Sequence, residues 1–203
     1  TLKTIQLSLI AMAIGLLIAI VCSWGKSHGG QWLRMAIDAY IEIIRNTPFL
    51  VQLFFFFFAL PTLGLQMSAS TAALVTMFVN LGAFATEILR AGIEAIPKGQ
   101  VEAGMALNLK RYQVFLHVVL RPALKTIFPA LSSQFILLML TSSIVSAISA
   151  DDLASVAANI QSETFRSFEI YITVTIIYFA LSLMFIGLFT ILWRKFLYYP
   201  EGR

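Results

Sequence analysis

The stretch 170–193, IYITVTIIYFALSLMFIGLFTILW, decides the fold class of this chain. It holds 24 consecutive uncharged residues, and Glu169 and Arg194 bracket it. A helix needs about 20 mainly apolar residues to cross the hydrocarbon core of a bilayer. This stretch therefore predicts a transmembrane helix.

The composition agrees with a membrane location. Of the 203 residues, 59% are hydrophobic and 12% are charged, whereas a soluble domain has about 25% charged residues. A soluble globule of this length could not bury that much apolar surface. The composition excludes a soluble enzyme, a disordered tail and a disulfide scaffold, and a single cysteine, Cys22, cannot form an internal disulfide.

Three other charge-free runs predict the remaining spans. Runs of 22 residues after Lys3 and 25 residues after Lys125 each fit one helix. The run of 41 residues after Arg45 is divided by the turn signal Pro61-Thr62-Leu63-Gly64, so it holds parts of two helices. It is too short for two full spans and a loop, so the first of these helices must begin before Arg45. We expect an all-α membrane protein, a single transmembrane domain over 1–203, with spans near 4–24, 38–60, 69–89, 122–143 and 170–193.

The distribution of Lys and Arg predicts the orientation. Eleven of the 14 basic residues fall in the loop 25–37, the segment 90–125 or the tail 194–203. The opposite side has only Lys3 and Arg166, and Arg45 lies between the two sides. Because cytoplasmic loops carry an excess of positive charge, we expect the N-terminus outside, and the C-terminus and the loop 90–121 in the cytoplasm.

Polar residues inside the expected spans form stripes. In the second span, Asp38, Glu42, Arg45 and Gln52 recur on one helical face. Ionisable groups inside a membrane cost about 2.5–3.5 kcal/mol each, so they face protein or water. Glu42 and Arg45, three residues apart, can neutralise each other and fix the helix to its neighbours. A direct role in a transport path is the alternative.

Similar stripes occur in the third and fourth spans. Small polar side chains there serve either helix packing or the passage of a polar, zwitterionic solute, and the sequence leaves both interpretations open. The candidate residues for a substrate path are Gln52, Asn80, Glu87, Gln134, Thr141, Ser142 and Ser143.

The loop 90–121 contains a short predicted helix. Pro97 and Gly99 end the preceding helix, and residues 101–107 favour a new one. Asn108 then fits a left-handed C-terminal cap. Val101, Met105 and Leu109 give this segment an apolar edge. Such a helix either docks into a groove on a partner or lies on the lipid surface, and the residues alone do not decide between these.

The chain lacks the sequence signals of an enzyme. No G-x-x-x-x-G-K-[ST] phosphate-binding loop or H-E-x-x-H metal motif occurs. The two histidines, His28 and His117, lie far apart in sequence. We therefore expect no catalytic residues, no metal site and no nucleic-acid partner. A membrane-embedded enzyme would need a convergent set of acid, base and nucleophile, which the sequence does not offer.

Four motifs carry a family resemblance. The segment 102–108, EAGMALN, resembles the EAA loop of ATP-binding-cassette (ABC) import permeases, and its flanks 87–100 and 120–124 resemble those of the polar amino acid branch. The segments 45–53, RNTPFLVQL, and 162–171, SETFRSFEIY, are similar to family stretches in the same order. The chain thus resembles the histidine/glutamine/arginine permeases of type I ABC importers.

This resemblance implies a transport subunit in a bacterial inner membrane. Its partners would be a second permease chain, two ATPase subunits that bind ATP and Mg²⁺, and an external solute-binding protein that delivers a small polar amino acid. This chain itself would bind no cofactor. The residues implied to couple it to the ATPase are Pro97, Gly99, Val101, Glu102, Ala103, Gly104, Met105, Ala106, Leu107 and Asn108. The alternative is a self-sufficient secondary transporter or channel driven by an ion gradient, which would use Glu42, Arg45 and Glu87.

The chain also departs from the family pattern. Many members have Lys-Asp where Leu140 and Thr141 stand here. If that Asp holds a substrate ammonium group, this subunit lacks it, and a different permease chain would supply the charge.

Overall fold

The computed structural model describes residues 1–197, and within them the regular elements are all helices. Their order is α1 (Leu2–His28), α2 (Gln31–Arg45), α3 (Phe49–Phe54), α4 (Leu60–Thr62), α5 (Ala69–Glu94), α6 (Lys98–Ala106), α7 (Arg111–Gln113), α8 (Arg121–Thr141), α9 (Leu153–Thr164) and α10 (Ser167–Phe196). Two π-helical segments, Phe55–Ala59 and Val114–Leu120, and the 3-10 helix Ser142–Ile148 join neighbouring helices.

Four helices in the described residues are long and apolar enough to cross a membrane: Leu2–His28, Ala69–Glu94, Arg111–Ile148 and Ser167–Phe196. The third of these runs from α7 through α8 to the 3-10 helix without a break, over 38 residues. The expected spans 4–24, 69–89, 122–143 and 170–193 all lie inside these helices. Each helix extends beyond its expected span because the expected bounds follow the charge-free runs, which leave out the polar turns at the helix ends.

The expected second span, 38–60, is wrong as one straight helix. Gln31–Arg45 and Phe49–Thr62 meet at an angle of 110°. Pro48 has extended backbone (φ −63°, ψ 141°), and its ring disfavours helical geometry in the residue before it. The two pieces form a broken span or a re-entrant loop, so Gln52 does not continue the stripe of α2.

Small residues bring α1 and α5 together. A Cβ atom on Gly15 would lie 2.9 Å from Leu81, and one on Gly82 would lie 2.8 Å from Ile18. Both distances are shorter than real contacts allow, so only glycine fits at these positions. Because helix pairs in lipid gain little from the hydrophobic effect, such close backbone approach supplies their packing energy.

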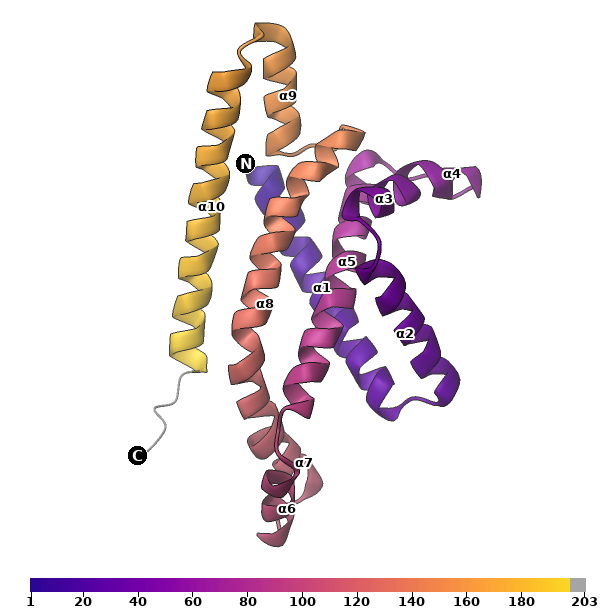
Figure 1. The fold of residues 1–203 in the computed structure, drawn as a ribbon, viewed down its shortest axis with the longest axis vertical. Coiled ribbons are helices and arrows are strands. Elements are labelled where there is room, and N and C mark those ends of the chain that lie inside the picture. The colour runs from indigo at the N-terminus through magenta and orange to yellow at the C-terminus, as the bar shows by residue number, and fades with distance from the viewer. Residues whose placement is uncertain (198–203) are drawn as a thin grey trace.

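The helices place two short elements at opposite ends of the molecule. In Figure 1, α9 lies at one end, close to the start of α1, and α6 and α7 lie at the other. Helix α5 leads toward α6, and α8 begins beside it and runs back. Helix α10 begins next to α9 and ends near the level where α8 begins.

Candidate functional site

Helix α6 has a defined end. The predicted helix 101–107 is observed as Lys98–Ala106. Asn108 has φ +58°, its amide donates to the Met105 carbonyl over 2.9 Å, and the Leu109 amide donates to the Gly104 carbonyl over 3.3 Å. This is the Schellman arrangement, in which asparagine can replace glycine. The predicted left-handed cap at Asn108 is confirmed.

Helix α6 packs against the rest of the chain through Gly104. Gly104 is the buried residue of α6, and a Cβ there would lie 3.3 Å from Val114 and 3.4 Å from Val118. Both valines belong to the π-helical segment Val114–Leu120. The small size of Gly104 thus serves packing within this chain, which the sequence did not indicate.

The rest of α6 faces outward. Met105 is 54% exposed and Leu107 is 76% exposed. Glu102, Ala103 and Ala106 are also exposed, whereas Val101 and Leu109 are half-buried. The predicted apolar edge of Val101, Met105 and Leu109 is therefore open mainly at Met105. An exposed surface of small and apolar side chains can accept a partner without desolvating many charges.

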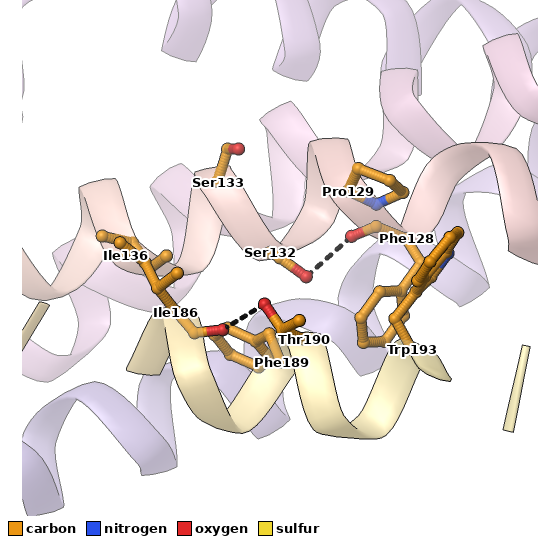
Figure 2. A pocket seen from close by; sticks show the side chains of 9 residues that line it. All are labelled: Phe128, Pro129, Ser132, Ser133, Ile136, Ile186, Phe189, Thr190 and Trp193. Carbon is orange, nitrogen blue, oxygen red and sulfur yellow. Dashed lines mark hydrogen bonds between the residues drawn. The ribbon is translucent and has the colours of Figure 1, made fainter. Parts of the chain in front are cut away.

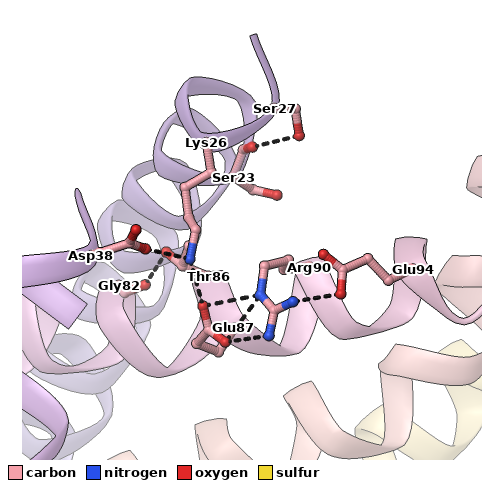
Figure 3. Close-up of polar contacts among 9 residues, drawn as sticks. All are labelled: Ser23, Lys26, Ser27, Asp38, Gly82, Thr86, Glu87, Arg90 and Glu94. Carbon is pink, nitrogen blue, oxygen red and sulfur yellow. Dashed lines mark hydrogen bonds and ion pairs between the residues drawn. The ribbon is translucent and has the colours of Figure 1, made fainter. Parts of the chain in front are cut away.

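A network of ion pairs joins α1, α2 and α5 (Figure 3). The Lys26 ammonium lies 2.6 Å from Asp38 Oδ1 and 3.2 Å from Glu87 Oε1. Glu87 also pairs with the Arg90 guanidinium at 2.8 Å, and Arg90 reaches Glu94. Glu87, a predicted substrate-path residue, thus has cationic partners on two helices. The spacing of Glu87 and Arg90 predicts their pairing. The Lys26 contacts depend on the tight turn between α1 and α2, which no local pattern reveals.

Two other predicted path residues meet at the break after α2. Gln52 is 5% exposed, and its Nε2 donates to the carbonyls of Ile44 at 2.7 Å and Thr47 at 3.0 Å. Asn80 Nδ2 on α5 donates to Gln52 Oε1 over 3.0 Å. Gln52 therefore satisfies backbone groups that the break leaves without helical partners, and it ties the break to α5.

The predicted path residues of the fourth span do not gather in one cavity. The hydroxyls of Thr141, Ser142 and Ser143 donate to carbonyls three or four residues earlier on their own helix. Ser142 is fully buried, and Gln134 is half-buried on α8. The 3-10 helix that follows α8 packs against α3 and α5, so Ser142 lies in the core and not on an open surface.

A polar hollow lies at the end of α2. Glu42, Arg45, Asn46 and Phe84 line a cavity of about 280 Å³. Asn46 Nδ2 donates to Glu42 Oε2 over 2.8 Å, and the Arg45 guanidinium lies 5.5 Å from the Phe84 ring centre. The predicted Glu42–Arg45 pair is thus replaced by separate partners. Sequence reasoning missed this site because Phe84 comes from α5, although the RNTP motif around Arg45 marks one side of it.

This hollow can bind both charges of a zwitterion. A carboxylate and a guanidinium stand three residues apart, and each keeps an exposed surface. Guanidinium groups bind carboxylates through two parallel hydrogen bonds, and a carboxylate accepts from an ammonium group. No group of three or more potential metal ligands occurs within residues 1–197.

The fold and these sites define a helical membrane protein of the transport class. The chain belongs to the family described as binding-protein-dependent transport system inner membrane component, whose model matches residues 11–198. It is therefore an inner-membrane component of a transport system, not an enzyme.

Individual relatives within this family are named for the transport of glutamine. A putative glutamine transport system permease protein GlnP of Rickettsia bellii is 35% identical over 91% of this chain and 85% of its own length. The glutamine transport system permease protein GlnP of Escherichia coli K12 is 34% identical over 89% of this chain and 84% of its own length.

A solved structure supports the same grouping. A crystal structure of an amino acid ABC transporter with histidines matches with a TM-score of 0.89 and 36% identity, over 96% of this chain and 91% of that chain. The methionine ABC transporter MetNI in an inward-facing conformation matches with a TM-score of 0.76 at 20% identity, over 95% and 92%, which concerns the fold alone.

Proposed function

We propose that this chain is the permease subunit of an ATP-driven importer of polar amino acids, with glutamine as the first substrate to test. The observation that carries the proposal is α6, a helix at one end of the molecule that ends in a left-handed cap at Asn108 and whose buried residue is a glycine. Relatives named for glutamine transport and a neighbour that is an amino acid transporter support the substrate class.

The coupling role falls on the exposed part of α6. Glu102, Ala103, Met105, Ala106 and Leu107 would contact the ATPase. Gly104 would seat the helix on its own chain, and Pro97, Gly99 and Asn108 would fix where the helix begins and ends. Val101 is half-buried beside them. A groove on the ATPase that takes a short helix with apolar anchors fits this arrangement.

The substrate path follows from the charged hollow. Arg45 would bind the substrate carboxylate, and Glu42 with Asn46 would bind its ammonium group. Gln52 and Asn80 would position this hollow by holding the break after α2. The other proposed path residues are Gln134 and Thr141 on α8, and Ser142 and Ser143 on the 3-10 helix that follows it. Glu87 is proposed to act from the ion-pair network at the α1–α2 turn.

The assembly follows the family. Two permease chains, two ATPase subunits and an external solute-binding protein would form the complex, with ATP and Mg²⁺ bound by the ATPases. The N-terminus would lie outside and the α6 end in the cytoplasm, as the basic residues indicate. The gradient-driven alternative is disfavoured because Glu87, one of its required groups, is held by two cations.

Uptake of labelled glutamine into proteoliposomes tests the proposal, using the chain reconstituted with its partner ATPase and solute-binding protein. We expect uptake that requires ATP and that unlabelled polar amino acids compete. Arg45→Gln should weaken uptake about ten-fold or more, since a charge-assisted hydrogen bond contributes about 1.5–3 kcal/mol. Arg34→Gln, on the same helix outside the hollow, is the matched control. Uptake driven by an ion gradient without ATP would overturn the proposal.

A further inference from the structure

Helix α10 borders two hollows that the proposed transport function does not use. One, of about 300 Å³, lies against α8 and is lined mainly by apolar side chains (Figure 2). The hydroxyls of Ser132 and Thr190 reach it, but each donates to a carbonyl of its own helix. The other, of about 450 Å³, lies between α9 and α10. None of the described residues that line the first hollow is charged, whereas Arg166 and Glu169 line the second.

The walls of the hollow between α9 and α10 are mainly apolar. Its lining from α9 recurs every three or four residues, which places it on one helical face, and consists of Leu153, Val156, Ala157, Ile160 and Thr164. The facing residues of α10 are Ile170, Thr173, Val174 and Ile177. The two threonine hydroxyls donate to carbonyls of their own helices. The two helices therefore form an apolar groove, which is called the α9–α10 groove below.

Two opposite charges stand at one end of the α9–α10 groove. Arg166 is the N-cap residue of α10, and Glu169 lies in its first turn. Both residues are exposed, and within residues 1–197 neither takes part in an ion pair. A guanidinium group binds a phosphate or carboxylate through paired hydrogen bonds, and a carboxylate accepts strong hydrogen bonds from an ammonium group. This end of the groove can therefore bind both charges of a zwitterionic group.

The groove extends from the membrane boundary into the hydrocarbon. Glu169 immediately precedes the charge-free run 170–193, and the exposed Tyr171 is of a residue type enriched where headgroups meet hydrocarbon. At the other end, the Tyr178 hydroxyl of α10 donates to Asp152 at the start of α9, so the two helices stay together to that level. The eight residues from Glu169 to Ile177 rise by about 12 Å, and the hydrocarbon of one leaflet is about 15 Å thick. The charges therefore lie at headgroup depth and the apolar walls at acyl-chain depth.

We propose that the α9–α10 groove binds phosphatidylethanolamine from the leaflet at the α9 end. Arg166 binds the phosphate of the headgroup, and Glu169 accepts hydrogen bonds from its primary ammonium group. One acyl chain lies between α9 and α10 against the apolar walls. The pair of opposite charges matches a zwitterionic headgroup, and the depth of the charges and of the walls matches the two layers of a leaflet. Both observations favour a lipid over a protein segment.

Photolabelling by lipids that carry a diazirine on one acyl chain tests the site. The full chain is placed in phosphatidylcholine vesicles with a small fraction of photoreactive phosphatidylethanolamine, phosphatidylcholine or phosphatidylglycerol, and mass spectrometry identifies the labelled peptides. We expect phosphatidylethanolamine to label 153–164 and 167–177 about five-fold more than either other lipid, since one ionic contact at the membrane surface changes the affinity about five-fold. The quaternary ammonium of phosphatidylcholine has no N–H to donate to Glu169, and phosphatidylglycerol has no cationic group.

Variants assign the preference to the two charges. Glu169→Gln should remove the preference for phosphatidylethanolamine, and Glu169→Arg should replace it with a preference for phosphatidylglycerol. Arg166→Gln should reduce labelling of the groove by all three lipids about five-fold. The matched control is Glu163→Gln, an exposed carboxylate on α9 outside the lining, which should keep the preference. Val156→Trp, at a lining residue that is 51% exposed, should fill the apolar part and reduce labelling by all three lipids while the chain still inserts.

Four results would overturn the proposal. Equal labelling by the three lipids would show that the groove does not select a headgroup, and an equal loss in the Glu163 control would show only an effect of general surface charge. An unchanged preference in Glu169→Arg would show that this carboxylate does not contact the headgroup. Absence of label on 153–164 and 167–177 with every lipid would show that protein, either a second copy or another subunit, covers the groove.

Discussion

The short helices α6 and α9 lie at opposite ends of the molecule, and they are attached in opposite ways. Asp152, 2% exposed, caps α9 by accepting from the Ser155 amide over 2.7 Å. Its other oxygen accepts from the Tyr178 hydroxyl on α10 at 3.2 Å, and the Leu153 amide donates to Thr4 Oγ1 on α1 at 3.0 Å. Helix α6 follows Pro97, which has no polar side chain, and its buried residue is Gly104.

This difference distinguishes α9, which the rest of the chain holds in place, from α6, which has an exposed face. Side chains from α1 and α10 hold α9, so its position is fixed by the fold. Helix α6 packs through Gly104 and leaves Glu102 and Met105 exposed. Because a helix this short is marginal alone, the exposed face of α6 agrees with the proposed docking to a partner.

The largest effect is expected from reversing the charge of Glu102 on α6. Glu102→Arg should weaken association with the ATPase about 100-fold and abolish ATP-driven uptake, because a misplaced charge at an interface costs several kcal/mol. Co-purification of the ATPase with the permease measures this directly. Glu163→Arg, an exposed glutamate on α9, should leave the ATPase bound. Normal co-purification of the Glu102 variant would refute the docking role.

The second effect concerns the anchor of α9. Asp152→Ala should lower the free energy of unfolding by about 2–4 kcal/mol, because it removes a helix cap and leaves the hydroxyl of the half-buried Tyr178 without this acceptor. Thermal unfolding in detergent measures the loss. Asp151→Ala, an exposed neighbour, should leave the unfolding temperature unchanged, and an equal loss there would remove the distinction.

The third effect concerns the seat of α6. Gly104→Trp should cost about 1–3 kcal/mol of local packing, since bulk is forced against Val114 and Val118. It should abolish uptake and speed proteolysis of the loop 95–110 while membrane insertion continues. Gly104→Ala should be milder, because a Cβ meets only flexible valine methyl groups. Unchanged proteolysis in the Trp variant would mean that Gly104 does not seat the helix.

The smallest effect should come from Thr4. Thr4→Val keeps the shape of the side chain but removes the acceptor for the Leu153 amide, at a cost of about 1 kcal/mol. Hydrogen exchange should be faster at Leu153 and unchanged at Gly104. If exchange at Leu153 stays at its original rate, the contact between α1 and α9 does not hold that end.

The sequence predicts most of the helices because charge-free runs report membrane depth directly. It also predicts the cap at Asn108, which depends only on local backbone chemistry. It fails at the second span because apolar composition cannot reveal the 110° break at Pro48. It also fails where partners are distant in sequence: Gln52 and Asn80 are 28 residues apart, and Lys26 and Glu87 are 61 apart.

The candidate site also has one part that the sequence predicts and one part that only the fold reveals. The segment that we propose to couple to the ATPase is contiguous, so its residues could be named from sequence. The charged hollow combines the end of α2 with Phe84 from α5, and only the fold brings these together. The hydroxyl residues Thr141, Ser142 and Ser143 are of the type expected in a substrate path, but each donates its hydrogen bond to a backbone carbonyl of its own helix.

The unbroken helix Arg111–Ile148 has a mechanical consequence. Its first turns support α6 through Val114 and Val118, and its far end packs against α3 and α5. At 1.5 Å per residue, its 38 residues form a lever about 57 Å long. A tilt of about 5° at the α6 end would move the far end by about 5 Å, so a small push by a nucleotide-driven motor would become a displacement the size of a substrate.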